Sequence, residues 1–208
     1  MSLEKNKVIL VGYSGHAYVV ADILLRTGAS LIGYCDAVEK ENNPFGLPWY
    51  GDFHSDAANE VLEKSSFFIA IGNNKTRREI FGKLNAFSSV NAIDPSAIIS
   101  DRSTMGASVM VGTGVKINAF ASIGNGVICN TGAIIEHECI IADFAHLAPG
   151  SVLCGNVSVG ENSFIGANAV VKQGIKIGKN VTIGAGAVIL KDVADNCTVV
   201  GNPGRELL

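Results

Sequence analysis

Prolines, charged residues and long apolar runs are all scarce in this sequence. Only 5 prolines accompany its 24 glycines, which favours repeated tight turns over a collagen-like or low-complexity chain. Charged residues make up 17% of the chain and leave a net charge of −3, an acidic balance that argues against nucleic-acid binding. No apolar run is long enough to span a bilayer. Because 48% of the residues are hydrophobic, we expect a folded protein with a large core and no membrane segment.

Disulfide and secretion signatures are also missing. The five cysteines, at positions 35, 129, 139, 154 and 197, form no CxxC pair and leave an odd thiol over. The first seven residues are polar, and the apolar run after them enters a glycine turn, unlike a signal peptide. These features predict reduced thiols and a cytoplasmic location.

The first part of the chain, residues 1–94, alternates short strands with helices. Strands are predicted over Lys7–Val11, Leu31–Cys35 and Phe67–Ile71, because each is a short apolar run followed by Gly or Asp. Helical spacing predicts helices over Ala17–Leu25 and Thr76–Leu84, the second with Thr76 as its N-cap. This alternation indicates a parallel, Rossmann-like sheet with right-handed crossovers.

Glycine or aspartate stands directly after each predicted strand. Gly12, Asp36 and Gly72 would lie together at the carboxyl ends of the strands, where ligands bind in open parallel sheets. The turn that begins at Gly12 opens a helix whose backbone N–H groups can meet a phosphate. It is not the dinucleotide fingerprint, because Ala17 stands at the third glycine and the first spacing differs. We expect a ligand at this edge, with a tight turn that binds nothing as the alternative.

From Asp94-Pro95 onward the sequence has a period of six residues. An aliphatic or small residue recurs at every sixth position without a slip: Ile99, Met105, Val111, Ile117, Ile123, Cys129, Ile135, Ile141, Leu147, Leu153, Val159, Ile165, Val171, Ile177, Ile183 and Ile189. This period fits a parallel β-helix, in which each hexapeptide supplies one short strand and one corner. We therefore expect residues 95–208 to form a β-helix with Cys129 and Cys139 packed inside. The Gly or Asn that often follows the inward residue predicts a positive φ at that turn position.

Two of the four histidines, His137 and His146, fall in one segment of the repeat, at outward positions. Glu138 follows His137, and an imidazole beside a carboxylate is the arrangement of a general base. A solvated surface histidine is the alternative for His137. The six-residue repeat resembles that of the hexapeptide acyltransferase superfamily, and this resemblance implies a coil of three hexapeptides, or eighteen residues. The two histidines are nine residues apart, half of such a coil, so they cannot stack on one face of one chain. We therefore expect a homotrimer with a groove between neighbouring chains.

Three motifs carry a resemblance that covers essentially the whole chain. They are the turn Tyr13-Ser-Gly-His16, the run Phe68-Ile-Ala-Ile-Gly-Asn-Asn74 and the segment Asn130…Ile135-Glu-His-Glu-Cys139…His146. Together they resemble the bacterial nucleotide-amino-sugar N-acetyltransferases of the hexapeptide-repeat superfamily. The resemblance implies a left-handed β-helix acetyltransferase domain over residues 95–208 and a nucleotide-sugar-binding domain over residues 1–94. It also implies acetyl-coenzyme A as acetyl donor and a nucleotide-linked 4-amino-deoxy sugar, favoured as UDP-linked, as acceptor.

The resemblance also assigns roles to individual residues. The family's general base falls on His137, with Glu138 as its orienting partner and Asn130 as a nearby site residue. The cofactor groove falls on His146, Gly155, Ala167 and Ala185. The nucleotide sugar falls on Ser14, Gly15, His16, Asp36, Gly72, Asn73 and Asn74. The family enzyme that makes UDP-di-N-acetylbacillosamine has an acidic pair where this chain has Asp36-Ala37, which leaves the nucleotide open.

Other interpretations compete with this one. A sialic-acid O-acetyltransferase would share the fold and acetylate a sugar hydroxyl in place of the amine. A zinc-dependent carbonic anhydrase on the same β-helix needs three histidine ligands, and this repeat offers two, so we expect no metal. A nicotinamide oxidoreductase is disfavoured by the incomplete glycine fingerprint. A purely structural β-helix would not need the Glu136-His137-Glu138 cluster.

Overall fold

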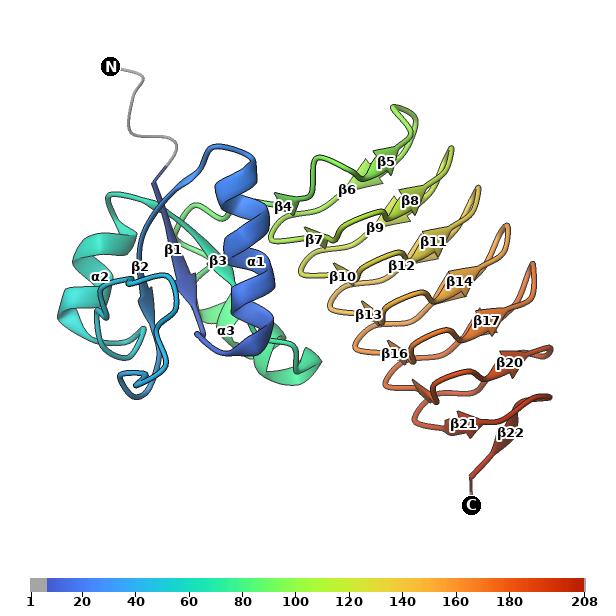
Figure 1. The fold of residues 1–208 in the computed structure, drawn as a ribbon. Helices are drawn as coiled ribbons and strands as arrows, with labels where there is room; N and C mark the ends of the chain where they lie inside the picture. Colours follow the sequence, from blue (N-terminus) through green and yellow to red (C-terminus); the bar gives the residue numbers. More distant parts are fainter. Residues whose placement is uncertain (1–6, 208) are drawn as a thin grey trace. The chain divides into compact units, whose positions relative to one another are not determined.

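The computed structural model describes residues 7–207 and contains two compact units that divide between Pro95 and Ser96 (Figure 1). The first unit mixes helices with a short parallel sheet, and the second consists of stacked coils with short strands. The predicted fold class, a Rossmann-like α/β region followed by a left-handed parallel β-helix, is confirmed. No helix within residues 7–207 is long and apolar enough to cross a membrane.

Three parallel strands form the sheet of the first unit, in the order β2-β1-β3. The elements of this unit are, in chain order, β1 (Lys7–Val11), α1 (Gly15–Arg26), β2 (Ser30–Cys35), α2 (Asp56–Leu62), β3 (Ser66–Ile69), α3 (Asn74–Lys83) and β4 (Ala92–Ile93). The predicted start of the last helix is wrong. Helix α3 begins at Asn74, because Asn73 Oδ1 accepts the Thr76 N–H at 3.0 Å and so caps the helix in place of Thr76.

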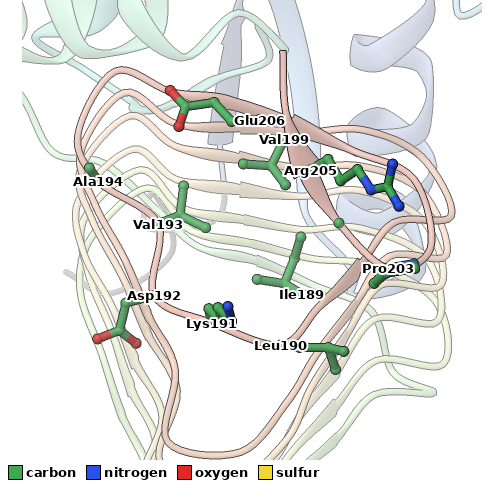
Figure 2. A pocket seen from close by; sticks show the side chains of 11 residues that line it. Ile189, Leu190, Lys191, Asp192, Val193, Ala194, Val199, Pro203, Arg205 and Glu206 are labelled. Carbon is green, nitrogen blue, oxygen red and sulfur yellow. The ribbon is translucent and has the colours of Figure 1, made fainter. Parts of the chain in front are cut away.

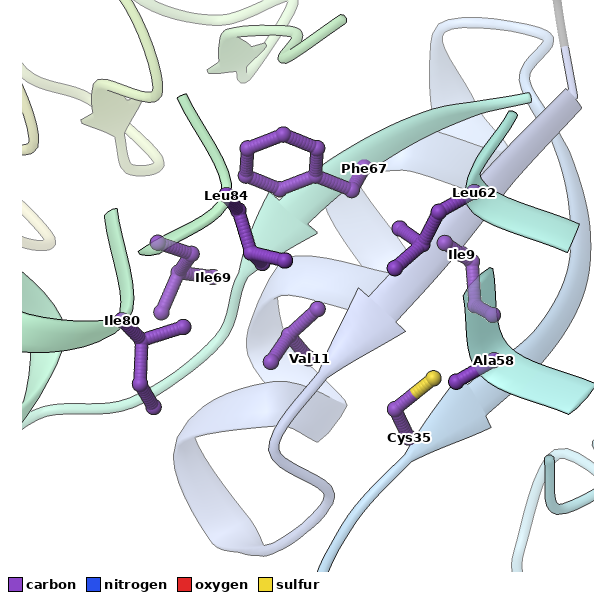
Figure 3. Close-up of a cluster of buried hydrophobic side chains, with 9 residues drawn as sticks. All are labelled: Ile9, Val11, Cys35, Ala58, Leu62, Phe67, Ile69, Ile80 and Leu84. Carbon is purple, nitrogen blue, oxygen red and sulfur yellow. The ribbon is translucent and has the colours of Figure 1, made fainter. Parts of the chain in front are cut away.

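The hydrophobic core of the first unit lies between the sheet and helices α2 and α3 (Figure 3). Its buried side chains are Ile9, Val11, Cys35, Phe67 and Ile69 from the strands, Ala58 and Leu62 from α2, and Ile80 and Leu84 at α3. Helix α1 buries its own apolar stripe, which includes Val20, Ile23 and Leu24. Because this packing fixes the three strands side by side, the turns that leave β1, β2 and β3 meet at one edge of the sheet.

Three parallel sheets form the faces of the second unit. The first face contains β7 (Met110–Val111), β10 (Ile128–Cys129), β13 (His146–Leu147), β16 (Phe164–Ile165), β19 (Thr182–Ile183), β21 (Thr198–Val200) and the antiparallel β22 (Arg205–Glu206). The second face contains β5 (Ile98–Ile99), β8 (Lys116–Ile117), β11 (Ile134–Ile135), β14 (Val152–Leu153), β17 (Val170–Val171) and β20 (Val188–Ile189). The third face contains β6 (Thr104–Met105), β9 (Ser122–Ile123), β12 (Ile140–Ile141), β15 (Ser158–Val159) and β18 (Lys176–Ile177).

Each coil is joined to the next by parallel pairing, with Ile128 opposite His146, Ile134 opposite Val152 and Ile140 opposite Ser158. The second residue of each strand points inward. Every member of the six-residue series from Val111 to Ile189 is buried, as are Cys129 and Cys139. The six-residue period is therefore confirmed as the repeat of the β-helix, and both cysteines pack in its interior.

The glycines that follow the inward residues do not have the positive φ that we predicted, so that interpretation is wrong. Positive φ occurs two residues later, for example at Ser108, Phe120, Glu138 and Asn156. The glycines are needed for a different reason, which is the close approach of the next coil. A Cβ added to Gly160 would lie 2.5 Å from the carbonyl carbon of Gly178, a distance that no real side chain shows.

We predict that Gly160→Ala destabilises the protein by about 1–3 kcal/mol, because the added methyl group overlaps the backbone of the next coil. Gly174→Asn is the matched control. Gly174 has a φ of +73° and an added Cβ there meets nothing within 4 Å, and Asn156 already adopts a positive φ one coil earlier. Urea unfolding of the two variants measures the difference, and equal stability would contradict the packing argument.

Candidate active site

His137 lies on the exposed corner between β11 and β12, and its side chain is 59% exposed. Its Nδ1 lies 3.0 Å from Glu138 Oε2, so the carboxylate holds the proton on Nδ1 and leaves Nε2 as the basic nitrogen. Hydrogen bonds to the flanking coils fix the corner: Glu138 N–H donates to Ala119 O, and Asn156 N–H donates to His137 O. A rigid scaffold therefore presents an oriented imidazole to solvent.

Gly155 is buried directly against the His137 ring. A Cβ added to Gly155 would lie 2.5 Å from both Cε1 and Nε2 of His137. Its N–H donates no hydrogen bond to another residue within 7–207. Because Gly155 has no side chain, the His137 imidazole can occupy the space beside it.

His146 stands on the first face, in β13, and belongs to a second cluster. Asn130 Nδ2 lies 3.3 Å from His146 Nε2, and Phe164 meets the imidazole edge to face, with ring centroids 5.1 Å apart. The structure thus joins Asn130 to His146 and Gly155 to His137. We predicted Asn130 as a site residue near His137 and Gly155 as part of the cofactor groove; within one chain, Asn130 lies beside His146 and Gly155 lies beside His137. Gly155 follows His137 by one coil of 18 residues, the spacing at which residues stack.

Ala167 and Ala185 stack on the corner that follows the first face, and Gly186 N–H donates to Ala167 O. Ala167 is partly exposed and Ala185 is exposed. Both side chains are small, so a flat ligand can lie along this corner without displacing them. Asn130 occupies the same corner two coils before Ala167, so these positions and the His146 cluster follow one side of the β-helix.

Other polar and sulfur groups of the second unit serve the fold. Asp143 Oδ1 accepts the N–H of Asn125 in the preceding coil at 2.7 Å. This carboxylate therefore stabilises the stack of coils. Burial raises the pKa of the Cys129 thiol to about 12, which removes it as a nucleophile. Among the described residues, no group of three or more His, Cys, Asp and Glu side chains is placed to hold a metal ion.

A cavity of about 480 Å³ lies at the C-terminal end of the β-helix (Figure 2). The apolar side chains of Ile189, Val193 and Val199 surround it, and Lys191 and Arg205 add positive charge to its lining. None of the predicted cofactor residues lines this cavity. It is therefore separate from the His137 and His146 clusters.

A second cavity, of about 230 Å³, lies at the carboxyl ends of β1 and β2 in the first unit. Gly12, Asp36 and Gly72 all line it, as does Ser14. Ser14 precedes α1 and makes no side-chain capping hydrogen bond, so its exposed hydroxyl is available to a ligand. Gly15 begins α1, and His16 follows within its first turn. The structure thus brings the strand-end residues together as the parallel sheet predicted.

Asp36 is tied to the turn that carries the glycines. Its Oδ2 accepts the Tyr13 N–H at 2.9 Å, and its Oδ1 pairs with Lys40 Nζ at 2.9 Å. The Tyr13 ring stacks on Tyr34 with centroids 4.2 Å apart. Asp36 therefore holds the turn at Tyr13 in place and also lines the cavity.

Arg77 holds the loop at the edge of this cavity, and the sequence pattern did not indicate it. It is 1% exposed, and its guanidinium donates to the carbonyls of Ile71 and Gly72 and to Asn74 Oδ1, each at 3.0 Å. It thereby fixes the loop over residues 72–74 at the edge of the cavity. Burial lowers the pKa of Arg77 to about 9, and burial and then Arg77 lower the pKa of His16 to about 4. Arginines on helices usually face solvent, so nothing in the sequence indicated that Arg77 would be buried.

Family models match both units of the chain. The PglD N-terminal domain matches residues 7–84, and the hexapeptide repeat of succinyl-transferase matches residues 156–191. A curated relative, GDP-perosamine N-acetyltransferase of Escherichia coli O157:H7, is 32% identical over 104 residues, which is 49% of this chain. The match spans 47% of that relative's length.

Solved structures match almost the whole chain. A mutant of the GDP-perosamine N-acetyltransferase of Caulobacter crescentus, in complex with CoA and GDP-perosamine, is 38% identical with a TM-score of 0.92 over 97% of both chains. The acetyltransferase domain of PglB from Neisseria gonorrhoeae, in complex with acetyl coenzyme A, is 32% identical with a TM-score of 0.89. That match covers 98% of this chain and all of that domain.

The lowered pKa of His16 predicts that this residue makes the protein less stable in acid. Its pKa falls from an ordinary 6.5 to about 4 in the fold, so below pH 6.5 the unfolded chain binds a proton that the folded chain does not. Stability should therefore drop by roughly 3 kcal/mol between about pH 6.5 and 4 through this group. Urea unfolding of wild type and His16→Asn across that range measures it, with the exposed His54→Asn as control. Parallel curves for wild type and His16→Asn would contradict the assignment.

Proposed function

This chain belongs to the nucleotide-amino-sugar N-acetyltransferases of the hexapeptide-repeat superfamily, and we propose that it acetylates a GDP-linked 4-amino-deoxy sugar. The acetyl donor in this proposal is acetyl-coenzyme A, and the general base is His137. The observation that carries the proposal is the 3.0 Å pair of His137 Nδ1 and Glu138 Oε2 on an exposed corner. This pair leaves Nε2 basic and accessible, as removal of a proton from an amine requires.

The chemistry assigned to these residues is a direct transfer. Acetyl-coenzyme A supplies an acetyl group activated as a thioester. His137 Nε2 accepts the proton that the amine loses as its nitrogen bonds to the acetyl carbon, and returns it to the sulfur that departs. Glu138 stabilises the imidazolium that forms in between. The Gly155 N–H, which no backbone carbonyl within 7–207 uses, is a candidate donor to the carbonyl oxygen as its charge develops.

The donor groove is proposed along the first face and the corner after it. His146, held by Asn130 and Phe164, would meet the thioester region. Ala167 and Ala185 would line the groove and contribute backbone contacts, since their side chains are methyl groups. Burial raises the pKa of the Cys139 and Cys129 thiols, which makes them poor nucleophiles. An acyl-enzyme is therefore not part of the proposal.

The acceptor's nucleotide is proposed to bind in the cavity of the first unit. Ser14, Asp36 and Gly72 line this cavity. Gly15 and His16 follow Ser14 at the start of α1, and Asn73 and Asn74 follow Gly72 at the start of α3. We expected a UDP-linked acceptor from the sequence. A GDP-linked acceptor is proposed in its place, because the relative that is 38% identical over 97% of both chains was solved with GDP-perosamine.

A homotrimer is proposed because the two histidine clusters lie on different sides of one chain. His146 is on the first face, and His137 is on the corner between the second and third faces. Outward residues of the second face are mostly apolar, namely Ile98, Ile134, Val152, Val170 and Val188. Packing this face against neighbouring chains buries the apolar column and brings His137 of one chain to His146 of the next.

The cytoplasm remains the expected compartment, because all five cysteines are free thiols. The second candidate activity, O-acetylation of sialic acid, would use the same base on a hydroxyl. The acceptor panel in the first experiment distinguishes the two. It also separates GDP-linked from UDP-linked amino sugars.

His137→Ala should lower kcat of acetyl transfer about 10²–10⁴-fold, because the amine then loses its proton without a base. Thiol release from acetyl-coenzyme A measures the rate with GDP-, UDP- and dTDP-linked 4-amino sugars, and with free and CMP-linked sialic acid. His54→Ala removes another exposed histidine and should keep full activity. Turnover on sialic acid alone would move the assignment to O-acetylation. Activity that survives in His137→Ala would mean that the base lies elsewhere.

A mixing experiment tests the site between chains. His137→Ala and His146→Ala homotrimers should each be nearly inactive. The two variants are then unfolded and refolded together in equal amounts. If each site combines His137 of one chain with His146 of the next, about one quarter of the sites should regain both histidines. Separate refolding followed by mixing is the control. A mixture that stays inactive, or a protein that is monomeric by light scattering, would exclude the shared site.

A further inference from the structure

Asp52 lines the cavity of the first unit, and neither the sequence nor the proposed roles assign it a function. It stands there with Asp36 and Phe53. We infer that the Asp52 carboxylate binds the donor edge of a guanine base and makes this chain selective for a GDP-linked acceptor. This inference rests on the proposed function, because it concerns the nucleotide of that acceptor.

The backbone before Asp52 is held along β2 like an added strand. Tyr34 N–H donates to Pro48 O at 2.9 Å, Tyr50 N–H donates to Tyr34 O at 3.0 Å, and Asp36 N–H donates to Gly51 O at 3.0 Å. Asp52 follows as the chain turns into α2, where Ser55 N–H donates to its carbonyl oxygen at 2.8 Å. The residue is therefore placed firmly at the ligand-binding edge of the sheet.

The carboxylates of Asp36 and Asp52 differ in how many of their oxygens already accept a hydrogen bond. Both oxygens of Asp36 are engaged, by Tyr13 N–H and by Lys40 Nζ. Asp52 Oδ1 accepts only the His54 N–H at 2.9 Å, and Oδ2 accepts no hydrogen bond from any described residue. Burial, and next the Asp52 charge, raise the pKa of the Cys35 thiol to about 12, so the carboxylate lies near the Cys35 wall of the cavity. Asp52 thus offers acceptors where Asp36 does not.

The rest of the lining fits a planar base. Phe53, Ile71 and Ile80 supply aromatic and aliphatic walls, on which bases pack. A volume of about 230 Å³ suits one part of a nucleotide sugar, because sites for whole ligands of that size are larger. A base fits this cavity because its flat apolar faces can pack on the Phe53, Ile71 and Ile80 side chains while its polar edge meets the carboxylate.

The arrangement of N–H groups differs between guanine and uracil. Guanine presents two adjacent donors, its ring N1–H and its exocyclic 2-amino group, and one carboxylate accepts both. Uracil presents a single N–H between two carbonyl oxygens, and those oxygens would face the negative charge of Asp52. The cavity therefore favours guanine and disfavours uracil.

Binding of plain nucleotides tests the inference without the transfer reaction. Calorimetry on the full chain measures the Kd of GDP, IDP and UDP, where IDP is GDP without the 2-amino group. Wild type should bind GDP at least about tenfold more tightly than IDP or UDP, since a paired carboxylate and base edge discriminate by this much or more. Asp52→Asn should remove that preference. Asp56→Asn changes an exposed carboxylate four residues along the chain and should keep it.

Each other result overturns the inference in a recognisable way. Equal binding of GDP and IDP by wild type, or tighter binding of UDP, means that no group reads the 2-amino edge. Equal weakening of all three nucleotides in Asp52→Asn means that Asp52 holds the ribose hydroxyls. The comparison of nucleotides on wild type needs no variant, so it stands even if Asp52→Asn does not fold. If none of the three nucleotides binds, the proposed acceptor class is wrong as well.

Discussion

Backbone hydrogen bonds between stacked coils are the interaction on which the second unit depends. They place each strand residue opposite the one 18 positions along, as Ile128 is opposite His146. Strands β5 to β20 are only two residues long each, so their pairing gains strength only from the continuous stack. The same ladder dictates composition. A large side chain at every sixth position fills the axis, and positive φ recurs at the corners. Glycine is required where an added Cβ would lie within 2.5–3 Å of the backbone of the next coil, as at Gly160 and Gly166.

This ladder frees the outward positions for chemistry. His137 and Glu138 occupy a corner that the flanking coils hold rigid through Ala119 and Asn156, so the imidazole is oriented without being buried. His146 occupies a strand on another face, braced by Asn130 and Phe164. A single β-helix cannot bring the two together. The two clusters lie on different sides of one chain, and for this reason the proposed site is placed between neighbouring copies of the chain.

In the proposed function, the first unit holds an anionic ligand beside acidic groups. Asp36 is neutralised by Lys40 and by the Tyr13 N–H, and a buried Arg77 binds the carbonyls of the loop at residues 71–72. The cation therefore lies behind the loop and does not need to touch the ligand. Burial and Arg77 also lower the pKa of His16, which keeps its imidazole neutral at physiological pH.

The sequence alone determined the fold class, the six-residue coil, the inward core and the outward position of His137, because periodicity is a local property that stacking preserves. It also determined that Gly12, Asp36 and Gly72 share one edge, since parallel strands align their carboxyl ends. Tertiary structure decided the rest. It paired Asn130 with His146 and placed Gly155 against His137, put positive φ two residues after the glycines that follow inward residues, and buried Arg77 behind the loop at residues 72–74. These features depend on contacts between residues of different coils, or between a helix and a loop. The order of residues along the chain does not show which of them come into contact.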